Sequence, residues 1–457
     1  MGNDPEIKRK KLFGTNGIRG VPNVDLTPEF CSDIATAIGT FSDTGNIAVG
    51  MDTRLSGDMI SSSVKAGLLS TGKNVIDLGI LPTPALQLYC RNNHVFGVVI
   101  TASHNPPQFN GIKCIGSDGT ELKQEDEARI EDIYYEKKYA RCQWNTIGTI
   151  SYFPGQIAEY HRSIISLVDA GKIRSRHYRV VVDAGNGAAY SSTPELLSKL
   201  GCAVTTLNAN PDGLFTSRNA EPRPENLSSL LDLMKTGRFD LGIAHDGDAD
   251  RAVFVDEKGN FIEGENTLAL AIRDVARKGD IVVTPVSSSD LISDICSSSG
   301  LKLLQTRVGA PIVARSMIEN SARIGGEENG GIIFGQHQYC RDGGMTAAKI
   351  LDIMARSGKR ISDLVAELPK YVLLKESIHT DIPWSKLSSM LKEHFRSNRM
   401  DFTDGLKIFF PGGWILVRPS GTEPIIRVYS NARNEKNADE LSNIFRSAFQ
   451  KITGSAS

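Results

Sequence analysis

The segment Gly45–Arg54, "GNIAVGMDTR", carries the pattern that organises most of this chain, a short strand-like run that ends in a polar loop. The pattern returns as "YRVVVDAGNG" at 178–187 and as "GDIVVTPVSS" at 279–288. A helix-compatible segment follows each copy and ends at a glycine, as helices commonly do, before another apolar run begins. These glycines are Gly72, Gly201 and Gly300. The alternation of strands and helices predicts three similar α/β domains with parallel or mixed sheets.

The C-terminal part of the chain breaks this pattern. Residues 404–432 contain turn-linked runs that predict antiparallel strands, and residues 435–452 predict a helix. We therefore expect a smaller α+β domain here, entered through a linker near Pro369. The four expected domains are 1–154, 155–255, 256–369 and 370–457.

Each of the three repeats ends its second strand in a different polar loop. These loops are "VVITASHNP" at 98–106, "LGIAHDGDADR" at 241–251 and "ARIGGEENGG" at 322–331. Ligands of open α/β sheets gather at the carboxyl ends of strands, where these loops lie. Three copies with three different loops predict one shared site that is assembled between domains.

Composition excludes several classes of function. With 457 residues the chain is too long for a single core, and 52 basic against 53 acidic residues give a net charge of −1. That balance argues against a global electrostatic role on nucleic acid or a membrane surface.

Seven scattered cysteines without CxxC pairs predict reduced thiols rather than a disulfide framework or a zinc site. The N-terminus resembles no secretion signal, and no apolar run approaches the roughly 18 residues that span a bilayer. We expect a soluble cytoplasmic protein.

The loop "AHDGDADR" places three carboxylates at alternate positions directly before Arg251. They are Asp246, Asp248 and Asp250. Two unit charges about 4 Å apart repel by roughly 4 kcal/mol at an effective dielectric of 20, a cost that a bound cation removes. An all-oxygen ligand set favours magnesium, whereas a solvated turn with splayed carboxylates is the alternative. An EF-hand is excluded because Arg251 stands where that loop needs glycine and because strand-like runs flank the loop. Arg251 itself suits phosphate recognition beside the metal.

Ser103 follows an apolar run and precedes His104 and two prolines. The segment lacks the G-x-S-x-G elbow of serine hydrolases, and adjacent side chains on an extended chain would point to opposite faces, which argues against a Ser–His dyad. A phosphoserine fits better, because a magnesium ion held by the aspartates would anchor its charge. His104 and Lys113 are then candidates for proton transfer or phosphate contact, and a proline-rich turn is the structural alternative.

Two further loops have the composition of ligand-binding segments. "VRPSGTEP" combines a guanidinium, hydroxyls and unobstructed backbone amides, the components of a phosphate cradle. The residues concerned are Arg418, Ser420, Gly421 and Thr422. Arg427 either adds a second positive charge or, as a strand residue, faces solvent. "GGEENGG" at 325–331 places two carboxylates and an amide among four glycines, which suits close contact with sugar hydroxyls but also describes a surface turn.

Taken in order, the motifs "FGTNGIRG", "TASHNPPQFNGIK", "DGDADR", "GEENGG" and "RPSGTEP" resemble those of the α-D-phosphohexomutases. That family comprises phosphoglucomutase, phosphomannomutase and phosphoglucosamine mutase. The serine and DGDADR segments are highly specific, and the other motifs add weight through their order along nearly the whole chain. The resemblance implies a heart-shaped protein with four domains and one central cleft.

The resemblance also implies roles for the residues of the first two loops. Ser103 would be the phosphoserine and a ligand of one Mg²⁺ ion, with the three aspartates completing the site. His104 and Lys113 match positions with roles in proton transfer and orientation. Arg19 of "GIRG" and Arg251 match active-site arginines.

For the substrate, the resemblance implies that Glu327 grips the sugar hydroxyls and that Asn329 sits where a serine is common. The loop of Arg418 to Thr422 would hold the non-reacting phosphate. Phospho-Ser103 would phosphorylate a hexose monophosphate, and the resulting hexose 1,6-bisphosphate would turn within the closed cleft and return its other phosphate. The fourth domain would act as a lid that retains this intermediate.

The motifs bear unequally on the choice of sugar. "FGTNGIRG" and "RPSGTEP" are similar to phosphoglucosamine mutases, which makes glucosamine phosphate the expected substrate and mannose or glucose phosphate the alternative. "GEENGG" lacks the serine and terminal histidine of the common sugar loop and resembles archaeal members. "RVGAP" has Ala310 where phosphomannomutases often have histidine, and His337 is a candidate replacement for the missing imidazole.

Two other classes remain as alternatives to a mutase. A non-catalytic sugar-phosphate sensor on the same fold would not need a phosphate carrier, so Ser103, the three aspartates and Lys113 argue against it, and a Ser/His hydrolase is the third option. Partners other than hexose phosphates are not expected, and the protein would be a monomer or a homodimer.

Overall fold

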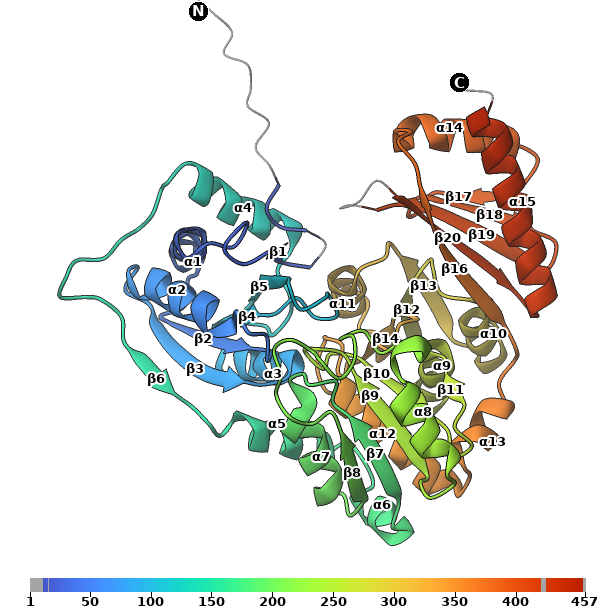
Figure 1. The fold of residues 1–457 in the computed structure, drawn as a ribbon, viewed down its shortest axis with the longest axis horizontal. Coiled ribbons are helices and arrows are strands. Elements are labelled where there is room, and N and C mark those ends of the chain that lie inside the picture. The colour runs from blue at the N-terminus through green and yellow to red at the C-terminus, as the bar shows by residue number, and fades with distance from the viewer. Residues whose placement is uncertain (1–10, 15, 421–424, 455–457) are drawn as a thin grey trace, which may run out of the picture. The chain divides into compact units, whose positions relative to one another are not determined.

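The computed structural model describes residues 11–14, 16–420 and 425–454. These residues form two compact units (Figure 1). The first unit contains the chain up to Phe261 together with His337–Arg356, and the second contains Ile262–Gln336 and the chain from Ser357 onward. Each unit contains two β-sheets.

The first sheet of the first unit has six strands in the order β1-β5-β4-β2-β3-β6. Their bounds are β1 Ile18–Gly20, β2 Asn46–Met51, β3 Asn74–Ile80, β4 Phe96–Ile100, β5 Asn110–Ile115 and β6 Ile150–Tyr152. β2 pairs in parallel with β3 and β4, whereas β5 is antiparallel to β4 and β1. The associated helices are α1 Pro28–Phe41, α2 Gly57–Leu69, α3 Thr83–Asn93 and α4 Gln124–Tyr135. Apolar side chains of α1 and α2 form a buried core with one face of this sheet.

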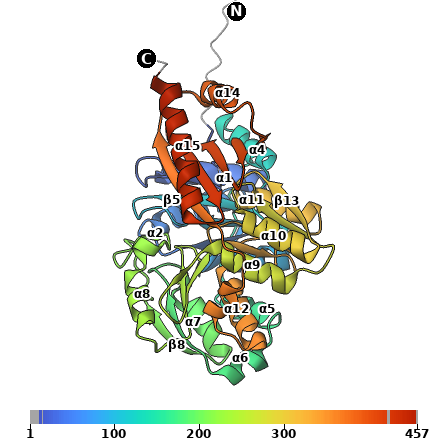
Figure 2. The ribbon, with the colours of Figure 1, turned by 90° about the vertical axis from the view of Figure 1, so that its right-hand side faces the viewer.

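The second sheet of this unit has the order β11-β10-β9-β7-β8. Its strands are β7 Arg179–Asp183, β8 Ala203–Leu207, β9 Leu241–His245, β10 Ala252–Val255 and β11 Phe261–Ile262. The accompanying helices are α5 Gln156–Ile165, α6 Ala170–Arg176, α7 Ala189–Lys199, α8 Ser228–Lys235 and α12 Gly343–Ser357. A 3-10 turn, Pro224–Asn226, precedes α8. In Figure 2 the colours show α12, from late in the chain, beside α5 to α7, and Lys349 on α12 donates to the carbonyl of Leu167.

The second unit joins a mixed sheet to an antiparallel one. The mixed sheet, β13-β12-β14-β15, consists of β12 Ile281–Pro285, β13 Lys302–Thr306, β14 Ile324–Gly326 and β15 Ile332–Phe334. Its helices are α9 Gly264–Val275, α10 Asp290–Ser299, α11 Ala310–Glu319 and α13 Ile361–Ala366. The antiparallel sheet, β16-β20-β19-β18-β17, consists of β16 Val372–His379, β17 Met400–Asp401, β18 Leu406–Phe410, β19 Gly413–Pro419 and β20 Ile425–Ala432, with α14 Trp384–His394 and α15 Glu435–Gly454.

Side chains of the antiparallel sheet reach the mixed sheet within this unit. Lys407 is buried and donates from Nζ to the carbonyl of Val286 at 2.8 Å, just after β12. Its ammonium lies 3.8 Å from the ring centroid of Trp414, whose Nε1 donates to Asp290 at 3.1 Å. The two sheets are thus fastened to each other by buried polar contacts as well as by apolar packing.

The three repeated domains predicted from the sequence are confirmed, and they share one topology. In each mixed sheet the first strand of the repeat (β2, β7 or β12) lies between the second and the third strand and is parallel to both. The third strand (β4, β9 or β14) is followed by a strand that pairs with it in the antiparallel direction. The polar loops at 98–106, 241–251 and 322–331 are the turns between these last two strands. Gly72, Gly201 and Gly300 all have left-handed φ values beyond the ends of their helices, as expected.

The smaller C-terminal α+β domain is also confirmed, with the predicted helix present as α15. Among the described residues, no helix is both long and apolar enough to cross a bilayer.

Candidate active site

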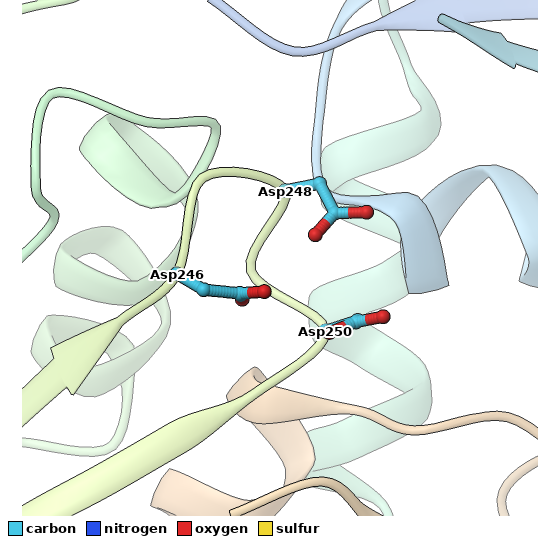
Figure 3. Close-up of side chains that lie close together, drawn as sticks. All are labelled: Asp246, Asp248 and Asp250. Atoms are coloured by element: carbon cyan, nitrogen blue, oxygen red, sulfur yellow. The ribbon is translucent and has the colours of Figure 1, made fainter. Parts of the chain in front are cut away.

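The aspartate loop connects β9 to β10, whose ends pair at His245 and Ala252. Its three aspartates are buried, and one carboxylate oxygen of each lies within 4.8 Å of those of the other two. Figure 3 shows the three carboxyl groups on the same side of the loop. Ala249, between the last two aspartates, has a φ of 58°, an uncommon conformation for a residue with a Cβ. The turn therefore holds the carboxylates together and does not splay them into solvent.

Cations from distant parts of the sequence compensate two of these carboxylates. The Lys113 ammonium on β5 donates to Asp248 Oδ2 at 2.8 Å, and the Thr83 hydroxyl at the start of α3 donates to the same oxygen at 2.8 Å. Arg341, in the segment before α12, donates to Asp250 Oδ2. Lys113 is only 1% exposed, so this is a buried ion pair.

The remaining oxygens have the character of metal ligands. Within the described part of the chain, Asp248 Oδ1 and Asp250 Oδ1 are buried without a hydrogen-bond partner. Burial and repulsion by Asp250 and Asp248 raise the pKa of Asp246 well above its usual range. Burial opposes ionisation of Asp248 as well, but the charge and hydrogen bond of Lys113, the Thr83 hydrogen bond and the charge of Arg341 together outweigh it and hold the pKa of that carboxyl below its usual range. Clustered carboxylates with unsatisfied oxygens fit a hard divalent cation such as magnesium.

Ser103 lies in the turn between β4 and β5 and faces the aspartate loop. Its hydroxyl is fully buried and donates to Asp246 Oδ2 at 2.8 Å. A Cβ on Gly247 would come within 2.5 Å of the Ser103 carbonyl, so the two loops approach each other at a position that only glycine allows. The backbone of Ser103 has a φ of 51°, a left-handed conformation. This geometry brings the serine to the three aspartates, as the sequence predicted.

A buried arginine on the loop after β2 holds the serine turn in this conformation. The Arg54 guanidinium donates one hydrogen bond to Asp52 and four to backbone carbonyls of the serine turn, at 2.7 to 3.1 Å. The carbonyls belong to Ser103, Asn105, Pro106 and Phe109. Asp52 also accepts from the Thr101 hydroxyl, which in turn accepts from the Ser103 amide. Every donor of this guanidinium is therefore used to shape one turn.

The second α/β domain uses the same arrangement for the aspartate loop. Arg218 is buried and donates from Nε to Asp183. Asp183 is the last residue of β7, and Asp52 has the equivalent position directly after β2. Its Nη2 donates to the carbonyl of His245 at 2.6 Å, directly before Asp246. An Asp–Arg pair at the end of the first strand thus anchors the loop after the third strand in both domains.

His104 lies between Ser103 and the arginines of the site. Its Nδ1 is 3.1 Å from Arg251 Nη2 and 3.4 Å from the Ser103 hydroxyl oxygen. The charge of Arg251, then burial and the charge of Arg19, hold the pKa of His104 well below its usual range, so the imidazole is neutral. Because a guanidinium only donates, Nδ1 is an acceptor and the ring proton lies on Nε2.

The expectation that Ser103 and His104 point to opposite faces is wrong. It assumed an extended chain, whereas the left-handed Ser103 turns both side chains toward the aspartate loop. The serine hydroxyl nevertheless donates to Asp246, not to the imidazole.

Three arginines surround these loops. Arg19 on β1 donates to the Asn105 side chain, and Arg251 Nε lies 3.8 Å from carboxylate oxygens of Asp246 and Asp250. Arg341 completes the group through Asp250. All the predicted residues of the serine and aspartate loops, together with Arg19, therefore lie in one cluster within the first unit.

The predicted sugar loop lies in the second unit, between β14 and β15. Glu327 is 4% exposed, and its amide donates to the Gly331 carbonyl at 2.9 Å. The Asn329 side chain accepts from the Gly331 amide at 3.1 Å and so stabilises the loop itself. Glu328, which lies between Glu327 and Asn329 in the loop, accepts a hydrogen bond from the Ser287 hydroxyl and forms an ion pair with Lys375 at 3.3 Å.

The predicted phosphate loop follows β19 in the same unit. Arg418 forms an ion pair with Asp404 at 3.0 Å and stands directly opposite Arg427 across the β19–β20 ladder. Ser420 donates its amide to the Ile425 carbonyl at 2.9 Å. Gly421 and Thr422 lie outside the described residues. Two arginines opposite each other on one face of a sheet, only one of them paired with a carboxylate among the described residues, place positive charge where it suits a phosphate.

His337, the candidate replacement for the missing histidine of the sugar loop, has other partners at both ring nitrogens. It is buried in the first unit, where Nε2 lies 3.1 Å from Asp342 and Nδ1 3.2 Å from the Ser163 hydroxyl. With both ring nitrogens engaged, it positions the segment that carries Arg341.

Four residues of the site were missed by sequence analysis: Thr83, Arg54, Arg218 and Arg341. A signal existed for two of them, since Asp52 and Asp183 occupy the same place in two repeats and imply a buried cation. No sequence signal pointed to Thr83 or Arg341.

Comparisons with known proteins agree with this architecture. Models described as phosphoglucomutase/phosphomannomutase α/β/α domains I, II and III match residues 10–141, 158–259 and 263–371. The model of the C-terminal domain of that family matches residues 363–448. The four models follow one another along nearly the whole chain.

Two relatives are similar over their full length. A "phosphoglucomutase/phosphomannomutase" of Thermococcus kodakarensis is 46% identical over 440 residues, which cover 94% of this chain and 96% of that protein. A "phosphoglucosamine/phosphogalactosamine mutase" of Sulfurisphaera tokodaii is 39% identical over 449 residues, covering 95% and 98%.

Solved structures show the same fold. A phosphoglucomutase/phosphomannomutase family protein from Burkholderia thailandensis superimposes with a TM-score of 0.86 at 25% identity, covering 97% of this chain and 98% of that one. The Aspergillus fumigatus N-acetylphosphoglucosamine mutase, solved with GlcNAc-6P and magnesium, has a TM-score of 0.61 at 17% identity, covering 96% of each chain. With four successive domain models and two full-length relatives, the chain is a phosphohexomutase of the phosphoglucomutase/phosphomannomutase family.

Proposed function

We propose that this chain moves a phosphoryl group between O6 and O1 of a hexose phosphate, with Ser103 as the carrier. The observation that carries the proposal is the Ser103 hydroxyl, buried and 2.8 Å from Asp246 in a cluster of three carboxylates and three arginines. Such a site can bind a phosphoryl group on the serine only if a cation offsets the carboxylates. Phosphoryl transfer needs positioning and charge neutralisation more than covalent chemistry, and this cluster offers both.

Magnesium would be held by Asp246, Asp248 and Asp250, together with an oxygen on Ser103. When bound, the ion supplies positive charge that offsets the carboxylates and the transferring phosphoryl group. Arg251 and Arg19 lie where guanidiniums can contact the oxygens of that group. Arg341 donates to Asp250 and helps to fix the orientation of its carboxylate.

Transfer requires a proton to leave the attacking sugar hydroxyl and another to reach Ser103 when the phosphate departs. The neutral His104 is one candidate, since its Nδ1 lies 3.4 Å from the serine oxygen. Lys113 is the other, and it also orients Asp248. Turnover of His104→Gln and Lys113→Met variants would separate their roles, because the first removes only a proton acceptor whereas the second also removes a charge.

The second unit carries the groups that suit the rest of the substrate. Glu327 offers a buried carboxylate to sugar hydroxyls, and Arg418 and Arg427 suit the non-reacting phosphate. A hexose 1,6-bisphosphate would serve as intermediate and as primer. It would turn before returning its second phosphate to Ser103.

We favour glucosamine 6-phosphate as the substrate, isomerised to glucosamine 1-phosphate. The motifs "FGTNGIRG" and "RPSGTEP" support this choice, as does the name of the Sulfurisphaera tokodaii relative. The Thermococcus kodakarensis relative, named for glucose and mannose phosphates, supports the alternative. Comparing turnover of the three sugar phosphates, each primed with its own bisphosphate, decides between them.

The test of the carrier is intact-mass measurement after incubation with magnesium and a hexose 1,6-bisphosphate. The wild-type protein should gain one phosphate, Ser103→Ala should gain none and lose mutase activity, and the exposed Ser175→Ala should behave as wild type. Normal activity in Ser103→Ala would overturn the proposal and favour another phosphate carrier. Absence of both phosphate incorporation and label exchange in the wild type would favour a sugar-phosphate sensor.

A further inference from the structure

Asp404 lies in the turn that joins β17 to β18, and its carboxylate contacts two other segments of the second unit. Asp404 Oδ2 is 3.0 Å from Nη2 of Arg418, near the end of β19. The same oxygen accepts a hydrogen bond at 2.9 Å from the amide of Val308, in the loop between β13 and α11. The two charged side chains are mostly buried, at 17% and 16% exposed. One carboxylate oxygen therefore joins the predicted phosphate loop to the "RVGAP" loop of the mixed sheet.

The turn that carries Asp404 is packed directly against Arg418. Gly405 has a left-handed φ of 75°, and a Cβ at this position would clash with the Val417 carbonyl and lie 2.8 Å from Arg418 Cβ. The next residue, Leu406, pairs with Val417 across the β18–β19 ladder. Because only glycine permits so close an approach, the backbone itself fixes Asp404 beside the arginine.

The ion pair leaves part of the Arg418 guanidinium available for a ligand. A guanidinium has five N–H donors in a fixed plane, and Asp404 contacts one of its three nitrogens. In the part of the chain that the structure describes, Arg418 Nε is buried and has no hydrogen-bond partner. A phosphate oxygen is an acceptor that would satisfy this donor. Asp404 thus holds one side of the guanidinium and leaves another side for an anion.

On the basis of the proposed role of the Arg418 loop in phosphate binding, we propose that Asp404 is a positioning residue for the non-reacting phosphate. It holds the Arg418 guanidinium in the orientation that the phosphate requires, and the Val308 amide holds Asp404 in turn. The mixed sheet thereby helps to shape a phosphate site that the antiparallel sheet carries.

The same contact would have the opposite effect if Asp404 competed with the phosphate for Arg418. A competing carboxylate has to move away before the anion binds, so its removal would strengthen binding. The Val308 amide and the packed turn at Gly405 hold Asp404 in place, and Nε is available while the ion pair is intact. These observations favour positioning over competition, and the two roles predict effects of opposite sign for one substitution.

Calorimetry with the unprimed full chain and magnesium tests the sign. The ligand is the 6-phosphate of glucosamine, glucose or mannose that the wild-type protein binds most tightly. Asp404→Ala should raise the dissociation constant about tenfold, although the change makes the site more positive and Coulomb attraction alone would tighten binding. Asp404→Asn keeps an acceptor oxygen and should lie between the two, while Asp439→Ala, on the exposed surface of α15, should bind like wild type. Unchanged or tighter binding by Asp404→Ala would overturn the proposal.

A double-mutant cycle separates positioning from a general loss of structure. Arg418→Ala should weaken binding more than Asp404→Ala does. Once Arg418 is absent, Asp404 has no guanidinium to hold, so adding Asp404→Ala should cause little further loss. Fully additive losses would show that Asp404 acts independently of Arg418 and would refute its positioning role.

The same variants distinguish the role of Asp404 from the phosphate assignment on which it depends. If Arg418→Ala binds the sugar phosphate as tightly as wild type, the loop does not hold the phosphate and both proposals are wrong. If Arg418→Ala loses affinity and Asp404→Ala does not, only the role of Asp404 is refuted. In steady-state assays, Asp404→Ala should raise KM with little change in kcat, because the non-reacting phosphate is bound in the ground state and the transition state alike. A lower kcat at unchanged KM would instead indicate a loss of folded protein and would contradict positioning.

Discussion

Replacing Arg54 with lysine tests how far catalysis depends on the shape of the serine turn. The arginine donates five hydrogen bonds, whereas a lysine has one nitrogen with three N–H groups. At least two of the five acceptors therefore lose their donor, although the positive charge remains. Each buried acceptor left unpaired costs about 1–3 kcal/mol, so the substitution weakens the turn by about 2–6 kcal/mol.

Because four of the five acceptors belong to the turn itself, we expect the damage to appear first in the position of Ser103. Misplacement of a reacting group by about 1 Å costs on the order of 100-fold in rate. Steady-state assays of Arg54→Lys should show a kcat lowered by about that factor, with little change in KM if the loops proposed above for sugar and phosphate bind the substrate, since the hydrogen bonds of Arg54 go to Asp52 and the serine turn. Phosphate incorporation into Ser103 should slow in parallel.

The matched control is Arg129→Lys, on the exposed surface of α4, where the arginine makes a weak ion pair with Asp126 at 3.4 Å and lies 5.1 Å from the ring centroid of Phe41, a position that a lysine can also occupy. It should retain wild-type kcat and thermal stability. If Arg54→Lys keeps the wild-type kcat and unfolding temperature, Arg54 does not position the turn. If the unfolding temperature collapses while the residual folded protein remains fully active, the arginine supports the fold and not the site.

Three further substitutions have distinct expected results. Gly247→Ala places a Cβ 2.5 Å from the Ser103 carbonyl, so kcat should fall at least tenfold, while Gly45→Ala, which has open space around it, should be neutral in the same assay. Arg341→Ala removes the hydrogen bond that fixes the orientation of the Asp250 carboxylate and should weaken magnesium binding measured by calorimetry, with partial recovery in Arg341→Lys; unchanged affinity in both would contradict this role. Burial raises the pKa of Glu265 from 4.5 to about 7. Between these two pH values the folded state keeps a proton that the unfolded state has released, so the free energy of unfolding falls as the pH rises. Glu265→Gln cannot ionise and does not lose stability in this way, so the unfolding temperature of the variant minus that of the wild type should increase as the pH is raised from about 5 to 8. A difference that stays constant over this range would show that the pKa of Glu265 is not raised in the folded state.

The loops of the site were predictable because each one follows a recognisable strand and contains residue types with few structural alternatives. Three aspartates at alternate positions and a serine before two prolines are local patterns, and the repeated topology places them at equivalent ends of strands. The fold class followed from the same repetition, since strand, helix and strand recur with similar spacing in three parts of the chain.

The residues that complete the site were not predictable for a different reason. Arg341 contacts Asp250 across 91 residues of sequence, and Arg54 contacts Ser103 across 49. Such contacts depend on how two sheets pack and on the exact conformation of each turn, neither of which is encoded by a local pattern. The left-handed backbone of Ser103 is likewise not encoded by a local pattern. The sequence argument assumed an extended chain at this residue and therefore placed the His104 side chain on the opposite face.

The left-handed φ of 51° at Ser103 bears on which hydroxyl amino acid can serve at this position. Threonine has the same hydroxyl group and accepts phosphate with the same chemistry. Its branched Cβ, however, is strongly disfavoured in this region of backbone space, at a cost of about 1–3 kcal/mol. The hydroxyl of either serine or threonine could accept a phosphate, but the left-handed backbone at this position favours serine, whose Cβ is unbranched. Exchange of Ser103 for threonine is therefore disfavoured by backbone geometry and not by the chemistry of the hydroxyl.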